Sequence, residues 1–148
     1  MSDSVIEFEE LKEEDLKIVA ELYDNDSLVK TDLIKMHNVY REIKDNEFYK
    51  MIVAKLNKKI VGFAYVNLHK DIFEKCKPYM TIWSIRVKNG YRRQGIGTKL
   101  FNYIEEIAKD KKCSFMCLIA ENDNIGANEF YKAIGYNKEN GYVKILGR

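Results

Sequence analysis

Apolar residues recur every three or four positions in two early parts of the chain, a period typical of amphipathic helices. The first part covers residues 12–25 and follows a short strand-like run at 4–11. The second covers residues 31–45, where Thr31 or Asp32 is the expected N-cap. The N-terminal region is therefore expected to supply one strand and two helices.

The apolar period then shortens to that of strands. Residues 49–56 and 60–69 are rich in β-branched and aromatic side chains and flank a turn at Asn57-Lys58-Lys59, so they predict a β-hairpin. Residues 79–87 have the same composition and predict a further strand.

Helical spacing returns from Ile96 to about residue 112, and the next apolar run, 113–120, predicts a buried strand. Residues 124–134 predict a last helix, and Asn140-Gly141 predicts a closing hairpin. Strands followed by alternating helix, strand and helix indicate an α/β fold with a sheet of mixed strand direction. No Gly-, Ser- or Pro-rich linker interrupts the 148 residues, so we expect a single domain over residues 1–148.

Composition excludes several classes of protein. With 46% hydrophobic and 32% charged residues, the chain is too apolar to be disordered. No run approaches the ~18 apolar residues of a membrane span. The N-terminus MSDSVIEFEE is acidic where a signal peptide is basic and then apolar. We therefore expect a cytoplasmic protein with no membrane partner.

The three cysteines and two histidines show no spacing of a usual metal framework, so we expect no metal site. Cys113 and Cys117 lie four residues apart in an apolar stretch. This pattern predicts two core thiols on one face, kept reduced in the cytoplasm.

Charge is distributed unevenly although the net charge is only +2. Residues 1–50 hold 14 acidic and 7 basic residues, a balance of −7, whereas residues 51–148 hold 9 and 18, a balance of +9. A basic half could meet phosphates and an acidic half cations, although solvated surface explains either alone. Few aromatics accompany the lysines of the basic half, so no nucleic-acid partner is expected.

A glycine-containing segment joins the strand predicted at 79–87 to the helix that starts at Ile96. It reads Arg92-Arg93-Gln94-Gly95-Ile96-Gly97-Thr98. Backbone N–H groups at such a junction can bind an anion, and glycine allows close approach. A single GxG pair is by itself weak evidence, since many such pairs are tight turns. A dinucleotide fingerprint is excluded because position 100 is leucine, and a P-loop because no Gly-Lys-Ser/Thr occurs.

Two motifs together point to a family. Arg92-x-x-Gly95-x-Gly97 resembles the pyrophosphate-binding signature of the GNAT superfamily of acyl-CoA N-acyltransferases. The run Asn124-x-x-Ala127-x-x-Phe130-Tyr131-x-x-x-Gly135-Tyr136 resembles that superfamily's second conserved segment, at the expected distance. The resemblance spans roughly residues 48–147 and implies a GNAT fold, a mixed and mostly antiparallel sheet flanked by helices. It also implies direct transfer of an acetyl group from acetyl-CoA to a primary amine of unknown identity, and leaves a homodimer open.

The resemblance assigns cofactor roles to particular residues. It implies that the strand residues Ile85, Arg86 and Val87 offer backbone groups to the pantetheine arm, and that the pyrophosphate is surrounded by Arg92, Arg93, Gln94, Gly95, Ile96, Gly97 and Thr98, mainly through main-chain N–H groups. Arg92 could instead be an exposed arginine that only serves solubility. Asn124 has two compatible roles, helix N-cap and hydrogen bond to the cofactor arm. Tyr131 lies on an apolar helix face and could be a core residue. The resemblance implies that its hydroxyl reaches the thioester sulfur and assists the leaving thiolate.

The group that deprotonates the amine is less evident. Presenting an alkyl amine of pKa ~10.4 in neutral form at pH 7 costs ~4–5 kcal/mol. Members of the superfamily often carry a glutamate near the positions of Trp83 and Ser84, but residues 79–87 contain no carboxylate. Glu121, acting through water, is the candidate base and His69 a second one, although each could be a surface residue. A catalytically silent acyl-CoA-binding module is the alternative.

The acceptor site is expected, from the resemblance, at residues 12–45 and 70–78. Acidic residues in these two segments favour a small cationic amine or a peptide amine; they include Asp24, Asp26, Asp32 and Asp71. A solvated acidic face would look the same.

Overall fold

The structure is a computed structural model that describes residues 5–92, 94–121 and 123–147. In chain order its elements are β1 (Ile6–Glu10), the 3-10 turn η1 (Glu13–Asp15), α1 (Leu16–Asp24), α2 (Leu33–Ile43), β2 (Tyr49–Leu56), β3 (Lys59–His69), β4 (Tyr79–Val87), α3 (Ile96–Asp110), β5 (Met116–Leu118) and α4 (Ile125–Ala133). They fall into two compact units, one ending at Cys117 and one beginning at Leu118.

The five strands form one sheet in the order β1-β2-β3-β4-β5, and the pairs from β1 to β4 are antiparallel. The segment leading into β5 instead runs parallel to β4. Its Ser114 N–H donates to the Pro78 carbonyl at 2.8 Å, and its Phe115 carbonyl accepts from the Met80 N–H at 3.1 Å. Residue numbers rise together along both segments, so β4 and β5 are parallel. The expected mixed, mostly antiparallel sheet is confirmed.

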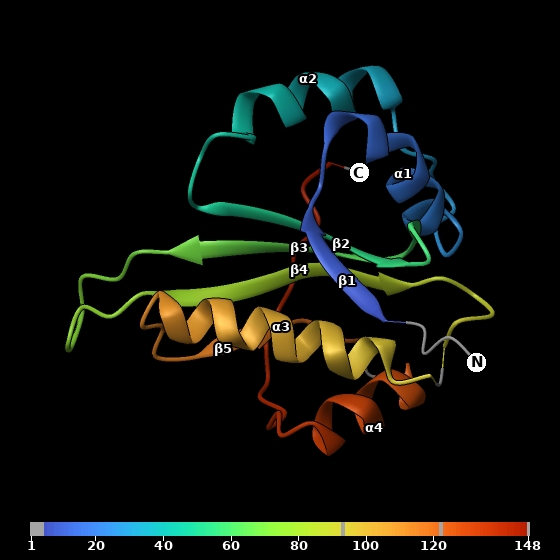
Figure 1. Cartoon of the computed structure of the whole chain (residues 1–148). Coiled ribbons are helices and arrows are strands. Elements are labelled where there is room, and N and C mark those ends of the chain that lie inside the picture. Colours follow the sequence, from blue (N-terminus) through green and yellow to red (C-terminus); the bar gives the residue numbers. More distant parts are fainter. Residues whose placement is uncertain (1–4, 93, 122, 148) are drawn as a thin grey trace. The chain divides into compact units, whose positions relative to one another are not determined.

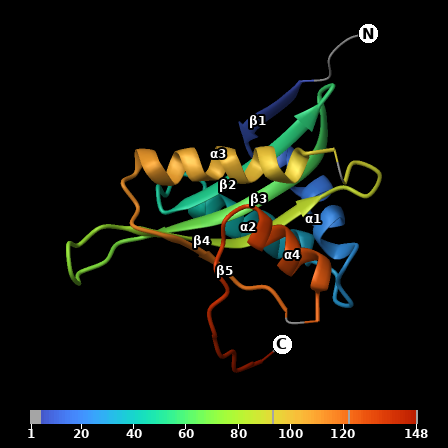
Figure 2. The same ribbon diagram turned by 90° about the horizontal axis from the view of Figure 1, so that it is seen from below.

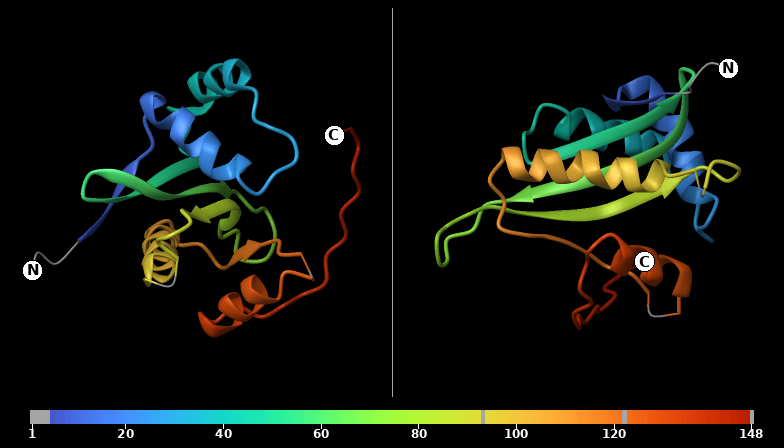
Figure 3. Two further views of the ribbon diagram at one scale, coloured as in Figure 1. Left: turned by 90° about the vertical axis from the view of Figure 1, so that its right-hand side faces the viewer. Right: turned by 60° about the horizontal axis from the view of Figure 1, so that its bottom comes forward.

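Helices cover both faces of this sheet. α1 and α2 lie on one face and α3 on the other (Figures 1 and 3). Figure 2 shows α3 stretched along its face of the sheet. Its buried residues recur at helical spacing and are Ile96, Leu100, Phe101, Ile104 and Ala108. On the opposite face, α1 is anchored by Leu16 and Val19 against Val53 and Phe63.

The β2–β3 hairpin follows directly from its turn. Asn57 and Lys58 have φ values of 51° and 66°, and Leu56 pairs with Lys59 across a two-residue loop. Positive φ at both central positions is the geometry of a type I′ turn, whose twist matches the flanking strands. The hairpin expected at this position is confirmed.

The closing hairpin predicted at Asn140-Gly141 is wrong. Within the second unit, residues 136–147 form neither strand nor helix, and Tyr142 and Leu146 are 100% and 91% exposed. A two-stranded hairpin is marginal in water unless one face is buried. A favourable turn dipeptide is therefore not enough to form strands here.

The predicted pair of core thiols is also wrong. Cys117 is exposed, and Cys113 is only partly buried, in the turn after α3. Burial raises the pKa of the Cys113 thiol. The strand predicted over 113–120 is only three residues long, so the four-residue spacing does not put both thiols in the core.

Among the described residues no helix is long and apolar enough to cross a membrane.

Gly62 is required by the close approach of β3 and β4. A Cβ built at this residue would lie 2.9 Å from the backbone carbonyl oxygen of Arg86. We expect Gly62→Ala to lower the free energy of unfolding by about 1–3 kcal/mol, because backbone must shift to admit the methyl group. Urea denaturation measures the effect. Gly126→Ala is the matched control, since a Cβ at Gly126 meets nothing within 4 Å; equal destabilisation by both variants would contradict the argument.

Glu13 joins η1 to α2 through its carboxylate, and its ionisation should make the stability of the fold depend on pH. Its Oε2 lies 2.8 Å from Arg41 Nη2 and 3.1 Å from His37 Nδ1. The hydrogen bonds from Arg41 and His37 lower the pKa of Glu13 from 4.5 to about 2. A lowered folded-state pKa stabilises the fold above the unfolded value, and this contribution is lost as pH falls from 4.5 towards 2.

We therefore expect Glu13→Gln to lower the melting temperature slightly at pH 7, since the pair is solvent-exposed. The difference from the wild type should shrink between pH 4.5 and 2.5. Thermal melts across this range measure it, and a difference that stays constant with pH would refute the role of Glu13.

Candidate active site

The N-terminus of α3 presents unused backbone donors. Gly95 is the N-cap residue and has φ 77° and ψ 6°, a left-handed conformation that favours glycine. The first helical hydrogen bond runs from the Lys99 N–H to the Gly95 carbonyl at 3.0 Å. The N–H groups of Ile96, Gly97 and Thr98 precede that bond, so the helix itself does not use them. A helix terminus of this kind favours an anion.

The loop before α3 is held by its own hydrogen bonds. The Tyr91 N–H donates to the Lys88 carbonyl at 3.0 Å, and Gln94 Nε2 donates to the Gly90 carbonyl at 3.1 Å. Gln94 therefore shapes the turn with its side chain. Arg93, assigned to the pyrophosphate from the sequence, lies outside the described residues.

The last part of β4 turns backbone groups away from β3. The Lys88 N–H donates to the Val61 carbonyl at 2.7 Å, just beyond the β3–β4 pairing. Hydrogen-bonded and non-hydrogen-bonded pairs alternate in an antiparallel ladder. Phe63 and Arg86 therefore bond to each other, whereas Ile85 and Val87 direct their N–H and carbonyl groups to the opposite edge.

That edge of β4 is only partly covered by its other neighbour. β5 has three residues against nine in β4, and the backbone bonds that align the two strands lie at the start of β4, at Pro78 and Met80. Two arginines reach the far end of the edge. Arg86 Nη1 donates to the Ile85 carbonyl at 2.8 Å, and Arg92 Nε donates to the Val87 carbonyl at 3.1 Å.

Both arginines also face one carboxylate. Asp26 Oδ2 lies 3.6 Å from Arg92 Nη2 and 3.8 Å from Arg86 Nε. The Arg86 guanidinium also stacks over the Tyr23 ring at 5.2 Å. Arg92 is thus more than an exposed solubilising residue, because it links the loop before α3 to the segment after α1. Its charge is partly neutralised there by Asp26.

A cavity of about 450 Å³ lies between α1, α2 and the sheet. Eighteen residues line it, and fourteen of them are aliphatic or aromatic. Most of them come from α1, α2 and strands β2 to β4, as illustrated by Val19, Val39, Met51, Tyr65 and Trp83. This volume and composition are those of a small-molecule pocket. We call it the apolar pocket.

Trp83 and Ser84 reach the apolar pocket from an irregular part of β4. Tyr65 pairs with Ser84 and Val66 pairs with Ile82, so Trp83 is the extra residue of a β-bulge. Cross-strand partners share a face, so Ser84 projects to the same side as Tyr65. Ser84 is 8% exposed, and its Oγ has no hydrogen-bond partner among the described residues.

Two tyrosines in the pocket wall keep their protons. Burial, followed by nearby acidic residues, raises the pKa of Tyr40, whose hydroxyl donates to the Leu11 carbonyl at 3.3 Å. Burial also raises the pKa of Tyr65. A phenol with a raised pKa donates hydrogen bonds and is a poor base at neutral pH.

The acids expected to attract a cationic acceptor are mostly engaged elsewhere. Asp24 accepts from the Thr31 N–H at 3.0 Å and from Thr31 Oγ1 at 2.7 Å. Asp26 faces the two arginines described above. Asp32 lines the apolar pocket, but it is the N-cap of α2 and accepts from the Lys35 N–H at 3.1 Å.

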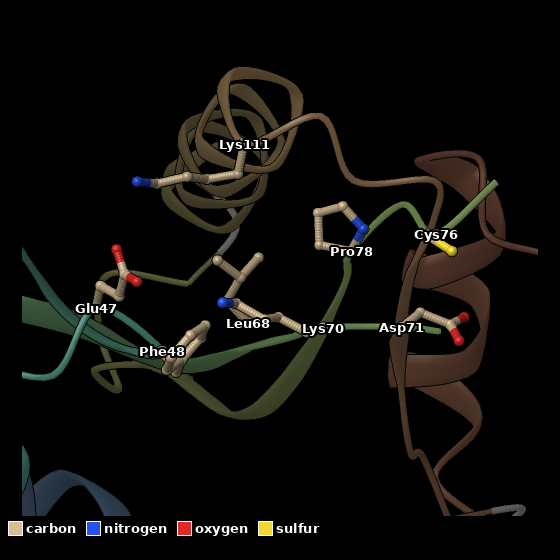
Figure 4. A pocket seen from close by; sticks show the side chains of 8 residues that line it. All are labelled: Glu47, Phe48, Leu68, Lys70, Asp71, Cys76, Pro78 and Lys111. Carbon is tan, nitrogen blue, oxygen red and sulfur yellow. The ribbon is translucent and has the colours of Figure 1, made fainter. Parts of the chain in front are cut away.

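Asp71 belongs to a second pocket, of about 320 Å³ (Figure 4). Figure 4 shows its carboxylate and that of Glu47 on opposite sides of this pocket, so they do not form a pair. The β3–β4 loop contributes Lys70, Asp71, Cys76 and Pro78 to this second pocket and no lining residue to the apolar pocket. The two segments expected to share one acceptor site thus line different cavities.

His69 lies in an aromatic stack. Its Nε2 is 2.8 Å from Thr81 Oγ1, and its ring stacks on Tyr79 with 4.7 Å between centroids. Tyr79 in turn stacks on Phe115 at 5.0 Å. Among the described lining residues of the apolar pocket there is no histidine.

The second unit carries the remaining predicted site residues. Asn124 is the N-cap of α4, because its Oδ1 accepts from the Ala127 N–H at 3.2 Å. The Tyr131 ring packs edge-on against the rings of Phe130 and Tyr136, with 5.8 and 6.2 Å between ring centroids. Glu121 is exposed three residues after β5, and its carbonyl accepts from Asn128 Nδ2 at 2.8 Å. The N-cap role of Asn124 is confirmed; the other roles in this unit remain predictions.

Sequence reasoning missed Ser84 as a lining residue and missed the pocket walls Met51 and Tyr65. Ser84 is a small polar residue in an otherwise apolar strand, which was a usable signal. Its burial without a partner depends on the β3–β4 register, which no local pattern supplies.

Comparison with known proteins agrees with this architecture. The sequence model of the GNAT acetyltransferase family matches residues 11–136. A bovine (Bos taurus) thialysine N-epsilon-acetyltransferase is 45% identical over 51 residues, which are 34% of this chain and 30% of that protein. The chain spans 30% to 49% of the length of the curated relatives it matches.

Two solved structures show the same fold. A transcriptional regulator from Bacillus halodurans C-125 superposes with a TM-score of 0.89 at 23% identity, covering 97% of this chain and 100% of that one. An aminoglycoside N-acetyltransferase, AAC(6')-Iy, solved in complex with CoA, superposes with a TM-score of 0.82 at 16% identity, covering 99% and 97%. The chain belongs to the GNAT acetyltransferase family, and the expected GNAT fold is confirmed.

The placement of Asp26 predicts an effect on anion binding at the α3 terminus. Asp26→Asn removes a negative charge that faces Arg86 and Arg92. We expect CoA to bind about two- to fivefold more tightly to this variant at low ionic strength, and the gain to fade in high salt.

Isothermal calorimetry at two salt concentrations measures this effect. Glu21→Gln is the control, because it removes the same charge from an exposed carboxylate on α1. Unchanged or weaker CoA binding by Asp26→Asn would show that Asp26 does not compete with the ligand.

Proposed function

We propose that this protein is an N-acetyltransferase that transfers an acetyl group directly from acetyl-CoA to a primary amine. The observation that carries the proposal is the combination of two kinds of unused backbone groups joined by one short loop. These are the N–H groups at the α3 N-terminus and the outward-facing backbone N–H groups of Ile85 and Val87 on β4. The family match across residues 11–136 supports treating residues 1–148 as one N-acetyltransferase domain.

These residues fit the chemical parts of acetyl-CoA. The pyrophosphate is an anion that suits the N–H groups of Ile96, Gly97 and Thr98 and the left-handed cap at Gly95. The pantetheine arm contains amide carbonyls, which suit the backbone N–H groups of Ile85 and Val87 at the edge of β4. The carbonyls of these two residues already accept from Arg86 and Arg92. When bound, acetyl-CoA supplies a thioester whose acetyl group can be transferred.

Residues of the second unit are assigned by their match to the family's second segment. In this proposal Tyr131 donates a hydrogen bond to the leaving thiolate, and Asn124 bonds the cofactor arm while capping α4. A thiolate resembling that of cysteine, with pKa ~8.5, needs only modest assistance to leave. Glu121 remains the proposed base, acting through water.

The acceptor in this proposal is a primary amine, and the acidic N-terminal segment favours a small cationic amine or a peptide amine. The bovine relative is named for acetylating an amino group, which agrees with an amine acceptor. A homodimer remains a prediction.

A catalytically silent acyl-CoA-binding module is the second candidate, favoured by one observation. β4 has no carboxylate, and the lining of the apolar pocket includes one carboxylate, Asp32, which already caps α2. Such a module would bind CoA but acetylate nothing.

One experiment separates the two candidates. Free thiol release from acetyl-CoA is followed with a diverse panel of primary amines, and the melting temperature is measured with and without CoA. Both candidates predict stabilisation by CoA, because a ligand that binds only the folded state stabilises it. Amine-dependent thiol release supports the transferase, and stabilisation without release identifies the silent module.

Tyr131→Phe tests the proposed thiolate donor, because it keeps the ring and removes only the hydroxyl. We expect turnover to fall by roughly 10- to 100-fold, near the low end of the general-acid range. CoA affinity should be nearly unchanged, and the free energy of unfolding should change by about 1 kcal/mol. Turnover is measured from pH 6 to 9 where chemistry limits the rate; a wild-type profile would make Tyr131 a packing residue only.

A further inference from the structure

The walls of the apolar pocket carry little charge. Four of the eighteen lining residues are neither aliphatic nor aromatic, namely Thr31, Asp32, Lys35 and Ser84. Asp32 and Lys35 supply one negative and one positive charge. The pocket therefore offers a cation no excess of negative charge. Asp24 and Asp26 lie in the segment beside it, but their carboxylates already contact other side chains.

An apolar wall discriminates between amines by what the amino group is attached to. Each methylene group buried against it improves binding about three- to fourfold. A second or third ammonium group gains nothing there and must lose water, which is costly without a paired carboxylate. The walls thus favour one amino group on an apolar body over a polyamine.

Ser84 provides the polar contact for that amino group. Its Oγ is buried, belongs to the pocket lining and has no hydrogen-bond partner among the residues that the structure describes. A buried hydroxyl left without a partner destabilises the fold, so such groups usually have one. An amine N–H entering the pocket can donate to this oxygen while its lone pair remains directed elsewhere.

We propose, building on the acetyltransferase function above, that the apolar pocket binds a primary amine carried on an aromatic or branched aliphatic body, and that Ser84 Oγ accepts a hydrogen bond from its amino group. Ser84 keeps its own proton in this arrangement. It acts as a substrate-binding residue and not as the base.

The single tryptophan of the chain makes the binding directly measurable. Trp83 lines the apolar pocket and is 61% exposed, so a bound ligand should change its fluorescence. The CoA-saturated protein, and the protein alone, are titrated with 2-phenylethylamine, ethylamine and spermidine. We expect 2-phenylethylamine to saturate with a Kd at least tenfold below those of ethylamine and spermidine.

Equal or tighter binding of ethylamine or spermidine would overturn the substrate class. This measurement needs no turnover, so it decides the pocket's preference even if the protein acetylates nothing. Thiol release with the same three amines decides the proposed function separately, and there the kcat/KM values should follow the same order.

A matched pair of variants on α2 locates the preference in the pocket. Val39 lines it and is 49% exposed, whereas Ile34 is 78% exposed and is not a lining residue. Val39→Asp should shift the ratio of the Kd values for 2-phenylethylamine and spermidine at least tenfold in favour of spermidine. Ile34→Asp should leave the ratio unchanged. Equal effects of both variants would place the preference outside the apolar pocket.

Ser84→Ala tests the polar contact. Because Ser84 Oγ has no partner in the described structure, the melting temperature should stay the same or rise. Binding of 2-phenylethylamine should weaken about three- to tenfold, with CoA affinity unchanged. Wild-type amine binding, or a loss of stability together with CoA binding, would show that Ser84 does not contact the amine.

Discussion

The ladder between β3 and β4 is the constraint on which the rest of the site depends. One hydrogen bond, from the Lys88 N–H to the Val61 carbonyl, shows which pairs of this ladder are bonded. The alternation then turns Ile85 and Val87 to the far edge of β4, where three-residue β5 is too short to pair with the whole strand. The same register pairs Ser84 with Tyr65, next to the bulge at Trp83, and turns Ser84 into the cavity under α1 and α2. A slip of one residue in this register would turn the backbone groups of Ile85 and Val87 toward β3 and move the Ser84 side chain to the other face of the sheet.

Several charged side chains of the first unit hold segments together. Glu13 joins η1 to α2, and Asp24 closes the loop between α1 and α2 through Thr31. Asp26 joins that loop to the arginines of β4 and of the loop before α3. The acidic balance of the N-terminal residues therefore says little about the acceptor. Internal partners use several of these carboxylates, and the cavity they surround is apolar.

Local features of the fold could be predicted from the sequence, and features that depend on distant partners could not. The bounds of β4 and the β2–β3 hairpin follow from neighbouring residues, and both were predicted, although the turn is one residue shorter than the expected Asn57-Lys58-Lys59 because Lys59 already pairs with Leu56. The hairpin at Asn140-Gly141 and a long strand over 113–120 need partners to form, and the structure has neither. At the site, Gly95 could be predicted from its place before a helix, whereas the unpartnered Ser84 and the contact of Asp26 with Arg92 depend on register and on long-range packing.

The missing base and the apolar pocket bear on the same physical problem. Presenting an alkyl amine in neutral form at pH 7 costs ~4–5 kcal/mol, and this cost is set by the pKa of the amine in water. Burial in apolar surroundings disfavours the charged form and lowers the pKa of an amine, by up to about 3–5 units when burial is complete. Burial acts in the same sense on Tyr40 and Tyr65, because it raises the pKa of each phenol and favours its neutral form. An amine that enters this pocket leaves its proton in the water outside, so the cost of deprotonation appears as weaker amine binding and a carboxylate on β4 is not needed to take the proton.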